Sequence, residues 1–238
     1  MLPNTDETKT IAVSAVTGIG ITLTAVGFTF EDTAGADHVG SLWALYHDIE
    51  GQAVNRAVAG TSAGIKCGGT WRVISHGTWA GAFAIEKSLD GAIWTNLRSF
   101  TSASDFNANT YGTEDMSDDA EPFYVRINVT SLTGGTLSVD LTTDPFVQKG
   151  IVKITAVAAG GVTATADVKR EIGRAATATV DWAEGSWSDY RGWPTTVEFC
   201  AADRLVFANT YTEPQTTWMT KTGNYSDFSR SDPLEDSL

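Results

Sequence analysis

The sequence predicts an all-β protein, and three features of the residue pattern support this fold class. Short runs of Val, Thr, Ile and aromatic residues alternate with small or polar residues, at the period of two that is typical of strands. Gly, Asn, Asp and Ser separate these runs, and turns favour these residues. No stretch has the 3.6-residue period of a convincing amphipathic helix. We therefore expect a central β-sandwich or jelly roll, flanked by two small repeated β-barrel or hairpin modules.

The first expected element is a strand–turn–strand unit that occurs twice in the chain. Residues 11–25 match residues 152–166 without a gap, and both copies contain glycine at the turn. Glycine supplies the positive φ that a tight hairpin turn demands. A two-stranded hairpin cannot bury its own apolar face, so each copy must belong to a small barrel or pack on a neighbour. We expect one small module over residues 1–66 and the other over residues 148–190.

The sandwich is expected between the two copies, over residues 67–147. Its clearest strands lie at residues 70–79, 123–129 and 136–141. Several strands at regular spacing with aromatic residues at inward positions are typical of sandwiches and jelly rolls. The Asp90-Gly91 dipeptide predicts a hairpin turn. The long polar stretch at residues 101–121 is expected to form a loop at one edge.

The composition restricts the partners of the protein. Among 238 residues, 29 are acidic and 16 basic, which gives a net charge of −13. A surface this acidic repels phosphates and anionic headgroups, so sequence-specific nucleic-acid binding is not expected. No apolar run approaches the roughly 18 residues that span a membrane, and the N-terminal residues lack the features of a signal peptide. Cys67 and Cys200 are expected to be small buried hydrophobic residues rather than a disulfide pair, and synthesis in a cytoplasm is expected.

Two patterns associated with catalysis have simpler explanations. Residues 60–64, Gly-Thr-Ser-Ala-Gly, match the nucleophile-elbow pattern around Ser62, but no helix follows and the later histidine is too near in sequence. His38, His47 and His76 have no zinc-binding spacing. We expect a loop of small residues and three structural histidines, and no catalytic, cofactor-binding or metal-binding residue.

The densest group of carboxylates predicts a solvated loop. Its members are Glu114, Asp115, Asp118, Asp119 and Glu121. Calcium prefers such oxygen ligands and is the alternative, although the residue order of an EF-hand is absent. A glycosidase would need two carboxylates roughly 5 to 9 Å apart, and the sequence singles out no such pair.

Aromatic residues of the middle module suggest a different class of function. The segment from Ser88 to Trp94 resembles the Asp-box hairpin of sialidases, in which Asp and Gly shape the turn and Trp fills the hairpin. Carbohydrate-binding sandwiches stack sugar rings on exposed Trp and Tyr faces. Trp71, Trp79 and Trp94 lie in the middle module, and strand alternation favours burial in the core for most of them. Exposure of Trp71 or Trp79 in a groove would favour a glycan-binding module, and burial would weaken that alternative.

The C-terminal part carries the most specific motifs. Residues 182–194 read Trp-Ala-Glu-Gly-Ser-Trp-Ser-Asp-Tyr-Arg-Gly-Trp-Pro, and Arg204-Leu205-Val206-Phe207 and residues 214–228 follow. This pattern is similar to one in bacteriophage tail structural proteins of the tail nozzle, or tail tubular protein B, type. Related sequences are often labelled after the small barrel in the catalytic half of ubiquitin-activating enzymes. A small barrel of this type would suit the repeated hairpins. Members of the family are much longer, so the chain resembles a fragment of one.

The resemblance implies a mechanical function without catalysis. Residues 191–238 would begin a propeller-like β region, and the protein would contact other phage tail proteins in the virion. A homo-oligomeric ring of the full-length protein and a conduit for DNA are also implied. An acidic lining would suit DNA passage because it does not bind phosphates. A carbohydrate-binding or adhesion module that recognises host surface glycans is the alternative.

Overall fold

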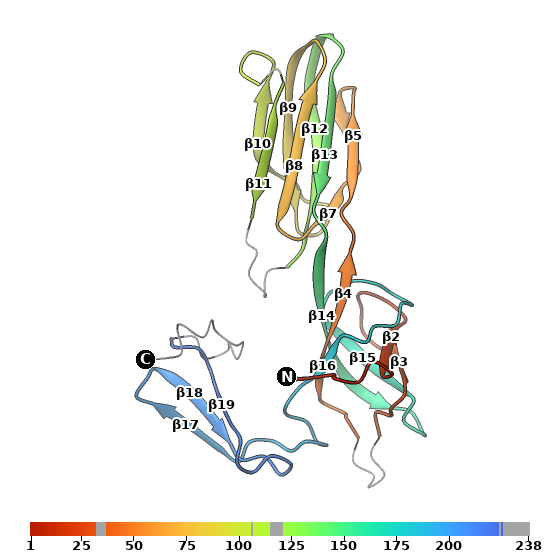
Figure 1. The fold of residues 1–238 in the computed structure, drawn as a ribbon, viewed down its shortest axis with the longest axis vertical. Helices are drawn as coiled ribbons and strands as arrows, with labels where there is room; N and C mark the ends of the chain where they lie inside the picture. Colours follow the sequence, from red (N-terminus) through yellow and green to blue (C-terminus); the bar gives the residue numbers. More distant parts are fainter. Residues whose placement is uncertain (32–36, 106, 115–120, 224, 226–238) are drawn as a thin grey trace. The chain divides into compact units, whose positions relative to one another are not determined.

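A computed structural model describes residues 1–31, 37–105, 107–114, 121–223 and 225, and all of its regular structure is β (Figure 1). The described residues contain no helix, which confirms the all-β prediction. The chain divides into two compact units. Met1–His47 and Lys149–Leu238 form one, called here the barrel-like unit, and Asp48–Gln148 form the other, called the sandwich unit. The sequence predicted that the sandwich would begin after residue 66 and end at residue 147. In the structure, the chain divides after residue 47 and after residue 148.

The barrel-like unit is built on a seven-stranded antiparallel sheet with the order β1-β16-β4-β14-β15-β3-β2. Its strands are β1 (Leu2–Pro3), β2 (Thr10–Val13), β3 (Ile21–Val26), β4 (Leu42–Ile49), β14 (Phe146–Val157), β15 (Thr163–Arg170) and β16 (Trp182–Glu184). The sheet curls back on itself, because Ile11 of β2 bridges Thr179 in the segment that leads into β16. The curled sheet encloses an apolar core.

That core depends on the period-two pattern of the two repeat copies. Alternate residues of β3 are buried and exposed, and Leu23 is fully buried. Val152 and Ile154 of β14 are equally enclosed. One end of the core is aromatic, since the rings of Phe28, Trp43 and Trp182 lie with centroids 4.9 to 6.0 Å apart. Edge and stacked contacts between such rings add to the free energy gained by burial.

The two repeat copies lie side by side in this one sheet. Each forms a hairpin, β2–β3 and β14–β15, and β15 pairs antiparallel with β3. Leu23 pairs with Ala164, the same position in the other copy, and Thr22 and Thr24 pair with Thr165 and Thr163. The copies, expected over residues 1–66 and 148–190, therefore share a sheet and a core. Because the sheet curls, the apolar sides of both hairpins line the same core and neither is left open as in a lone hairpin.

The sandwich unit has two antiparallel sheets. One has the order β10-β9-β12-β6, with β7 also pairing β12, and the other has the order β11-β8-β13-β5. The strands are β5 (Ala53–Arg56), β6 (Gly60–Thr61), β7 (Ile65–Cys67), β8 (Thr70–His76), β9 (Trp79–Ser88), β10 (Thr95–Thr101), β11 (Asn109–Thr113), β12 (Phe123–Gly135) and β13 (Ser138–Thr143). Inward residues of both sheets form one buried cluster, in which Val73, Ile85, Ile127 and Leu141 are fully enclosed.

One part of the expected edge loop is a strand. Within residues 101–121, β11 pairs with β8, so the prediction of a continuous loop there was wrong. The prediction failed because glycine at position 112 weakens the strand pattern in the sequence. The structure requires glycine there, since an added Cβ would lie 2.0 Å from the indole of Trp71. Glycine, which weakens most strands, is the residue that lets this ring lie against the backbone.

A three-stranded antiparallel sheet follows in the C-terminal part of the barrel-like unit. It contains β17 (Thr196–Cys200), β18 (Arg204–Ala208) and β19 (Thr217–Met219), with β18 in the middle. A short turn joins β17 to β18, with Asp203 at a φ of 57°. Both cysteines are free, and Cys67 is buried as expected, whereas Cys200 is only partly buried.

Candidate functional site

The nucleophile-elbow pattern begins on an edge strand, where a loop of small residues was expected, so that part of the prediction was wrong. Gly60 and Thr61 form β6, which pairs with β12. The Ser62 hydroxyl accepts a hydrogen bond from the Ile127 backbone at 3.0 Å and donates one to the Ala63 carbonyl at 2.8 Å. Both partners are main-chain groups, and no helix follows. The segment lacks the strand-to-helix turn on which a nucleophile elbow depends.

The three histidines belong to different elements of the chain: His38 precedes β4, His47 lies within β4, and His76 ends β8. His76 is exposed and its Nε2 lies 2.8 Å from Asp140 Oδ2, on the sheet that contains β8 and β13. A hydrogen bond from Asn55 lowers the pKa of Asp140, and His76 lowers it further. His38 and His47 are buried in the barrel-like unit. Among the described residues, no group of three or more His, Cys, Asp or Glu side chains is placed to hold a metal ion.

The acidic group is only partly described. Asp115, Asp118 and Asp119 lie outside the described residues, and Glu121 is exposed. Glu114 Oε2 lies 3.1 Å from the ammonium of Lys87, which also lies 4.1 Å from the centre of the Phe123 ring. Glu114 thus belongs to an ion pair at the margin of the sandwich core.

Trp71 and Trp79 are core residues. They are only 3% and 4% exposed, so neither ring face is available to a ligand. This burial weakens the glycan-binding alternative at the two positions named for it. Trp94 differs, because it is only partly buried on the outer surface of the sandwich unit.

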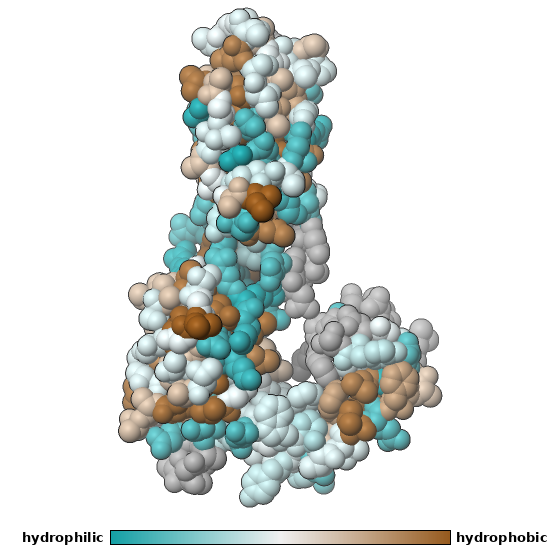
Figure 2. Space-filling model, turned by 180° about the vertical axis from the view of Figure 1, so that it is seen from behind, coloured by the Kyte–Doolittle hydropathy of each residue, from teal (hydrophilic) through white to brown (hydrophobic). Residues whose placement is uncertain are grey.

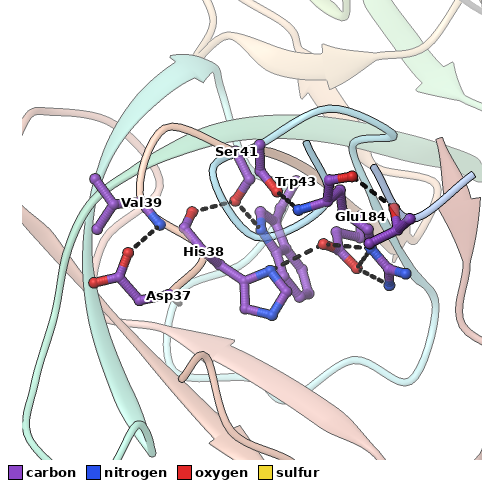
Figure 3. A network of polar contacts seen from close by, with 9 residues as sticks. Asp37, His38, Val39, Ser41, Trp43 and Glu184 are labelled. Atoms are coloured by element: carbon purple, nitrogen blue, oxygen red, sulfur yellow. Dashed lines mark hydrogen bonds and ion pairs between the residues drawn. The ribbon is translucent and has the colours of Figure 1, made fainter. Parts of the chain in front are cut away.

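The barrel-like unit contains a buried ionic cluster that links the curled sheet to the C-terminal segment (Figure 3). Glu184 is 4% exposed, at the end of β16, and pairs across the sheet with Trp43. Its Oε1 lies 2.9 Å from Nδ1 of His38, and its two oxygens accept hydrogen bonds from the guanidinium of Arg191. We call His38, Glu184 and Arg191 the clasp.

Electrostatics within the clasp favour the ionised carboxylate. Burial alone would raise the pKa of Glu184, but the contacts with His38 and Arg191 outweigh burial, and the pKa lies below its ordinary value. The hydrogen bond to Glu184 likewise raises the pKa of Arg191. A buried carboxylate with a bidentate guanidinium partner is a strong, directional contact.

Neighbouring groups fix the geometry of the clasp. The His38 ring lies between Trp43 and Tyr190, with centroid distances of 5.4 and 4.4 Å. Ser41 donates to the His38 carbonyl and accepts a hydrogen bond from Trp43 Nε1 at 2.7 Å, as Figure 3 shows. Ser41, Trp43 Nε1, Glu184 and Arg191 all form hydrogen bonds within the protein, which is typical of a structural site.

The sequence prediction missed the clasp, although one signal was available. In the run Trp182-Ala183-Glu184, strand alternation places the carboxylate on the same face as the buried Trp182. A charged side chain at an inward position needs a partner of opposite charge. The partner comes from Arg191, seven residues later, and no periodicity in the sequence indicates that distance.

Beyond the clasp, the three-stranded sheet carries only apolar side chains on one face and a mixture of polar and apolar side chains on the other. Residues directly opposite one another in an antiparallel pair share a face. One face accordingly carries Val197, Phe199, Leu205, Phe207 and Trp218. Thr196, Glu198, Cys200, Arg204, Val206, Ala208, Thr217 and Met219 occupy the other. We call the first set the apolar face.

The apolar face is only partly covered. Trp187 lies against Phe207 and Trp218, at centroid distances of 4.9 and 5.8 Å. Phe199 contacts Tyr225 at a centroid distance of 5.3 Å, and in the described part of the chain Val197 and Phe199 remain 59% and 56% exposed. Figure 2 shows hydrophobic surface gathered over this part of the chain. An exposed apolar sheet face is typical of a surface that contacts another protein.

Comparison with protein-family profiles, with curated proteins and with solved structures found no match to the chain. The described residues contain no helix long and apolar enough to cross a membrane.

Proposed function

We propose that the protein is a non-enzymatic structural component of a bacteriophage tail, which supplies rigid β modules to tail assembly and to the DNA conduit. The observation that carries this proposal is the apolar face, a sheet surface that contains no charged residue and is left partly open. Such a surface is suited to permanent contact with another protein rather than to solvent. The partners would be other phage tail proteins.

The residues that resemble phage tail proteins occupy the same region. Residues 182–194 contain β16 and the Glu184 and Arg191 side chains of the clasp. Residues 204–207 belong to β18, and residues 214–223 include β19. The resemblance therefore concerns the elements that build and hold the apolar face. This coincidence supports an assembly role for the region.

Rigidity is the second requirement of a mechanical component. The repeat copies share one sheet, and the clasp ties the following segment to it through buried charges. A homo-oligomeric ring of the full-length protein and a wall around DNA belong to the same proposal. The net charge of −13 would keep DNA from adhering to such a wall. Ejection that stays unchanged after acidic residues are neutralised would count against this part.

The test is immunogold microscopy of phage particles from the source culture, with antibodies against this chain. We expect gold confined to the tails, as for a virion protein synthesised in the bacterial cytoplasm. A matched serum raised against a host cytoplasmic protein should leave the tails unlabelled. Intact tails without gold, beside labelled cell debris, would overturn the proposal.

A further inference from the structure

The sandwich unit presents an ordered group of polar and aromatic side chains on its outer surface. Along β12, Val125, Ile127 and Val129 are buried in the core, while the alternate residues Tyr124, Arg126 and Asn128 face outward and are partly buried. Glu86 of β9 lies opposite Arg126 in the register. We call Glu86, Trp94, Tyr124, Arg126 and Asn128 the outer cluster.

The turn at Asp90 holds Trp94 in this cluster. Asp90 Oδ1 accepts hydrogen bonds from the Ser88 hydroxyl and from the backbone of Ala92 and Ile93, each at 2.8 Å. The hydrogen bonds from Ile93 and Ala92 lower the pKa of Asp90 to about 2, so the carboxylate stays ionised and the turn stays ordered. Trp94 Nε1 donates to the Gly91 carbonyl at 3.1 Å. The indole therefore lies in one orientation.

The indole lies against the sheet. The guanidinium of Arg126 is 4.1 Å from the centre of the ring, which is a close cation–π contact. An added Cβ on Gly64 would lie 2.8 Å from Cη2 of Trp94, so glycine at this position makes room for the ring. Trp94 is partly buried by these two contacts and keeps some of its ring surface in solvent.

Glu86 orients the neighbouring polar groups but does not engage all of their hydrogen-bond donors and acceptors. Its two oxygens each accept one hydrogen bond at 2.7 Å, from Arg126 Nε and from Asn128 Nδ2. Within the described residues, the terminal amino groups of Arg126, the Asn128 side-chain oxygen and the Tyr124 hydroxyl make no hydrogen bond. Donors and acceptors thus stand beside an ordered aromatic ring.

We propose that the outer cluster binds a neutral, pyranose-containing glycan. A sugar ring offers a C–H face that stacks on an indole and hydroxyl groups that pair with fixed donors and acceptors. Glu86 already neutralises Arg126, and the chain carries a net charge of −13, so a polyanionic glycan would be repelled. The site involves only the sandwich unit and is independent of the proposed assembly role.

The experiment uses the full chain labelled with 5-fluorotryptophan and observed by fluorine NMR. The probes are maltohexaose, cellohexaose, mannohexaose and chitohexaose, each at about 10 mM, which occupies most of a site of about millimolar affinity. Trp94→Phe assigns the Trp94 resonance by its disappearance. We expect at least one probe to shift that resonance in a saturable way, with the Trp71 and Trp79 resonances unmoved.

Variants distinguish binding at the cluster from other causes. Asn128→Ala should weaken the affinity for the active probe by about threefold to tenfold, the range for one hydrogen bond. Trp193→Phe is the matched control, because this exposed tryptophan lies in the barrel-like unit, and it should leave the affinity unchanged. The proposal is overturned if no probe shifts the Trp94 resonance, if Asn128→Ala leaves the affinity unchanged, or if oligogalacturonate binds and the neutral probes do not.

Discussion

Leu23 lies directly opposite Ala164 in the seven-stranded sheet, and the two residues occupy the same position in two copies of one repeat. The flanking pairs are Thr22 with Thr165 and Thr24 with Thr163. In the repeat, Thr22 corresponds to Thr163 and Thr24 to Thr165, so exchanging the two copies converts one pair into the other. The two hairpins are therefore related by an approximate two-fold axis through the Leu23–Ala164 pair. Two segments that begin 141 positions apart in the sequence complete one core.

The clasp is expected to contribute measurably to the stability of the barrel-like unit. Arg191→Ala leaves Glu184 buried beside His38 without its bidentate partner. Loss of one member of a buried ion pair costs about 3–5 kcal/mol, and the partial exposure of Arg191 reduces the expected cost to about 2–3 kcal/mol. Urea denaturation followed by tryptophan fluorescence measures it. Arg174→Ala, at an exposed arginine, is the control and should change stability by less than about 0.5 kcal/mol.

Stability should also depend on pH through Glu184. Its pKa is lower in the folded protein than its ordinary value of 4.5, so the unfolded state binds more protons near that pH. The stabilising contribution is complete above pH 4.5 and decreases as the pH falls through the folded pKa. Glu184→Gln should therefore flatten the decrease in unfolding free energy below pH 4.5. An unchanged pH profile in this variant would remove Glu184 from the explanation.

Gly112 is expected to tolerate no side chain. The Cβ of Gly112→Ala would lie 2.0 Å from the Trp71 indole, in the core of the sandwich unit. Overpacking of a filled core costs about 1–3 kcal/mol, and we expect the upper part of that range. Gly134→Ala is the matched control, because an added Cβ there meets no atom within 4 Å. Equal denaturation midpoints for the two variants would contradict the close approach.

The apolar face should bind a hydrophobic dye and mediate association. Phe199→Glu places a charge at the most exposed aromatic position of this face and should lower 8-anilinonaphthalene-1-sulfonate fluorescence and any concentration-dependent increase in mass. The cause is that a carboxylate resists transfer out of water. Light scattering after size-exclusion chromatography gives the mass. Thr196→Glu, on the opposite face of the same strand, should leave both signals unchanged.

The sandwich unit should fold by itself. Residues 48–148 contain both sheets and the whole buried cluster around Ile85 and Leu141. A chain of this length buries enough apolar surface for cooperative folding. Expressed alone, it should unfold in urea in one transition with the same midpoint by fluorescence and by circular dichroism. A gradual loss of signal, or midpoints that disagree, would show that the unit needs the rest of the chain.

Local patterns predicted the strands well and the pairing of distant segments poorly. Alternation identified the β12 region and the Asp90-Gly91 dipeptide identified the turn, because burial on one face and turn chemistry are both encoded over a few residues. The match between residues 11–25 and 152–166 identified the repeat. That the copies pair with each other depends on a contact across more than 100 residues, which no local pattern specifies. β11 was missed because Gly112 weakens the strand signal.

The same contrast between local patterns and contacts of distant segments applies to the candidate sites. Burial of Trp71 and Trp79 was expected from alternation. The loop expected over residues 60–64 begins instead as a strand, because Gly60 and Thr61 pair with β12, a distant segment. The clasp and the outer cluster were not predicted, because each joins side chains from different strands or turns. Trp94 lies over Arg126, for example, only because the Asp90 turn folds back toward β12.

The pairing of Leu23 with Ala164 also sets an order of events during synthesis. The first hairpin leaves the ribosome long before residues 152–166 exist, and the whole sandwich segment is made in between. At about 5–20 residues per second, the delay is roughly ten seconds. For that time β3 lacks its sheet neighbour β15 and the core residues of β14, so its apolar side is incompletely covered, and we expect chaperone binding to the nascent chain to concentrate on the first repeat copy while the sandwich folds.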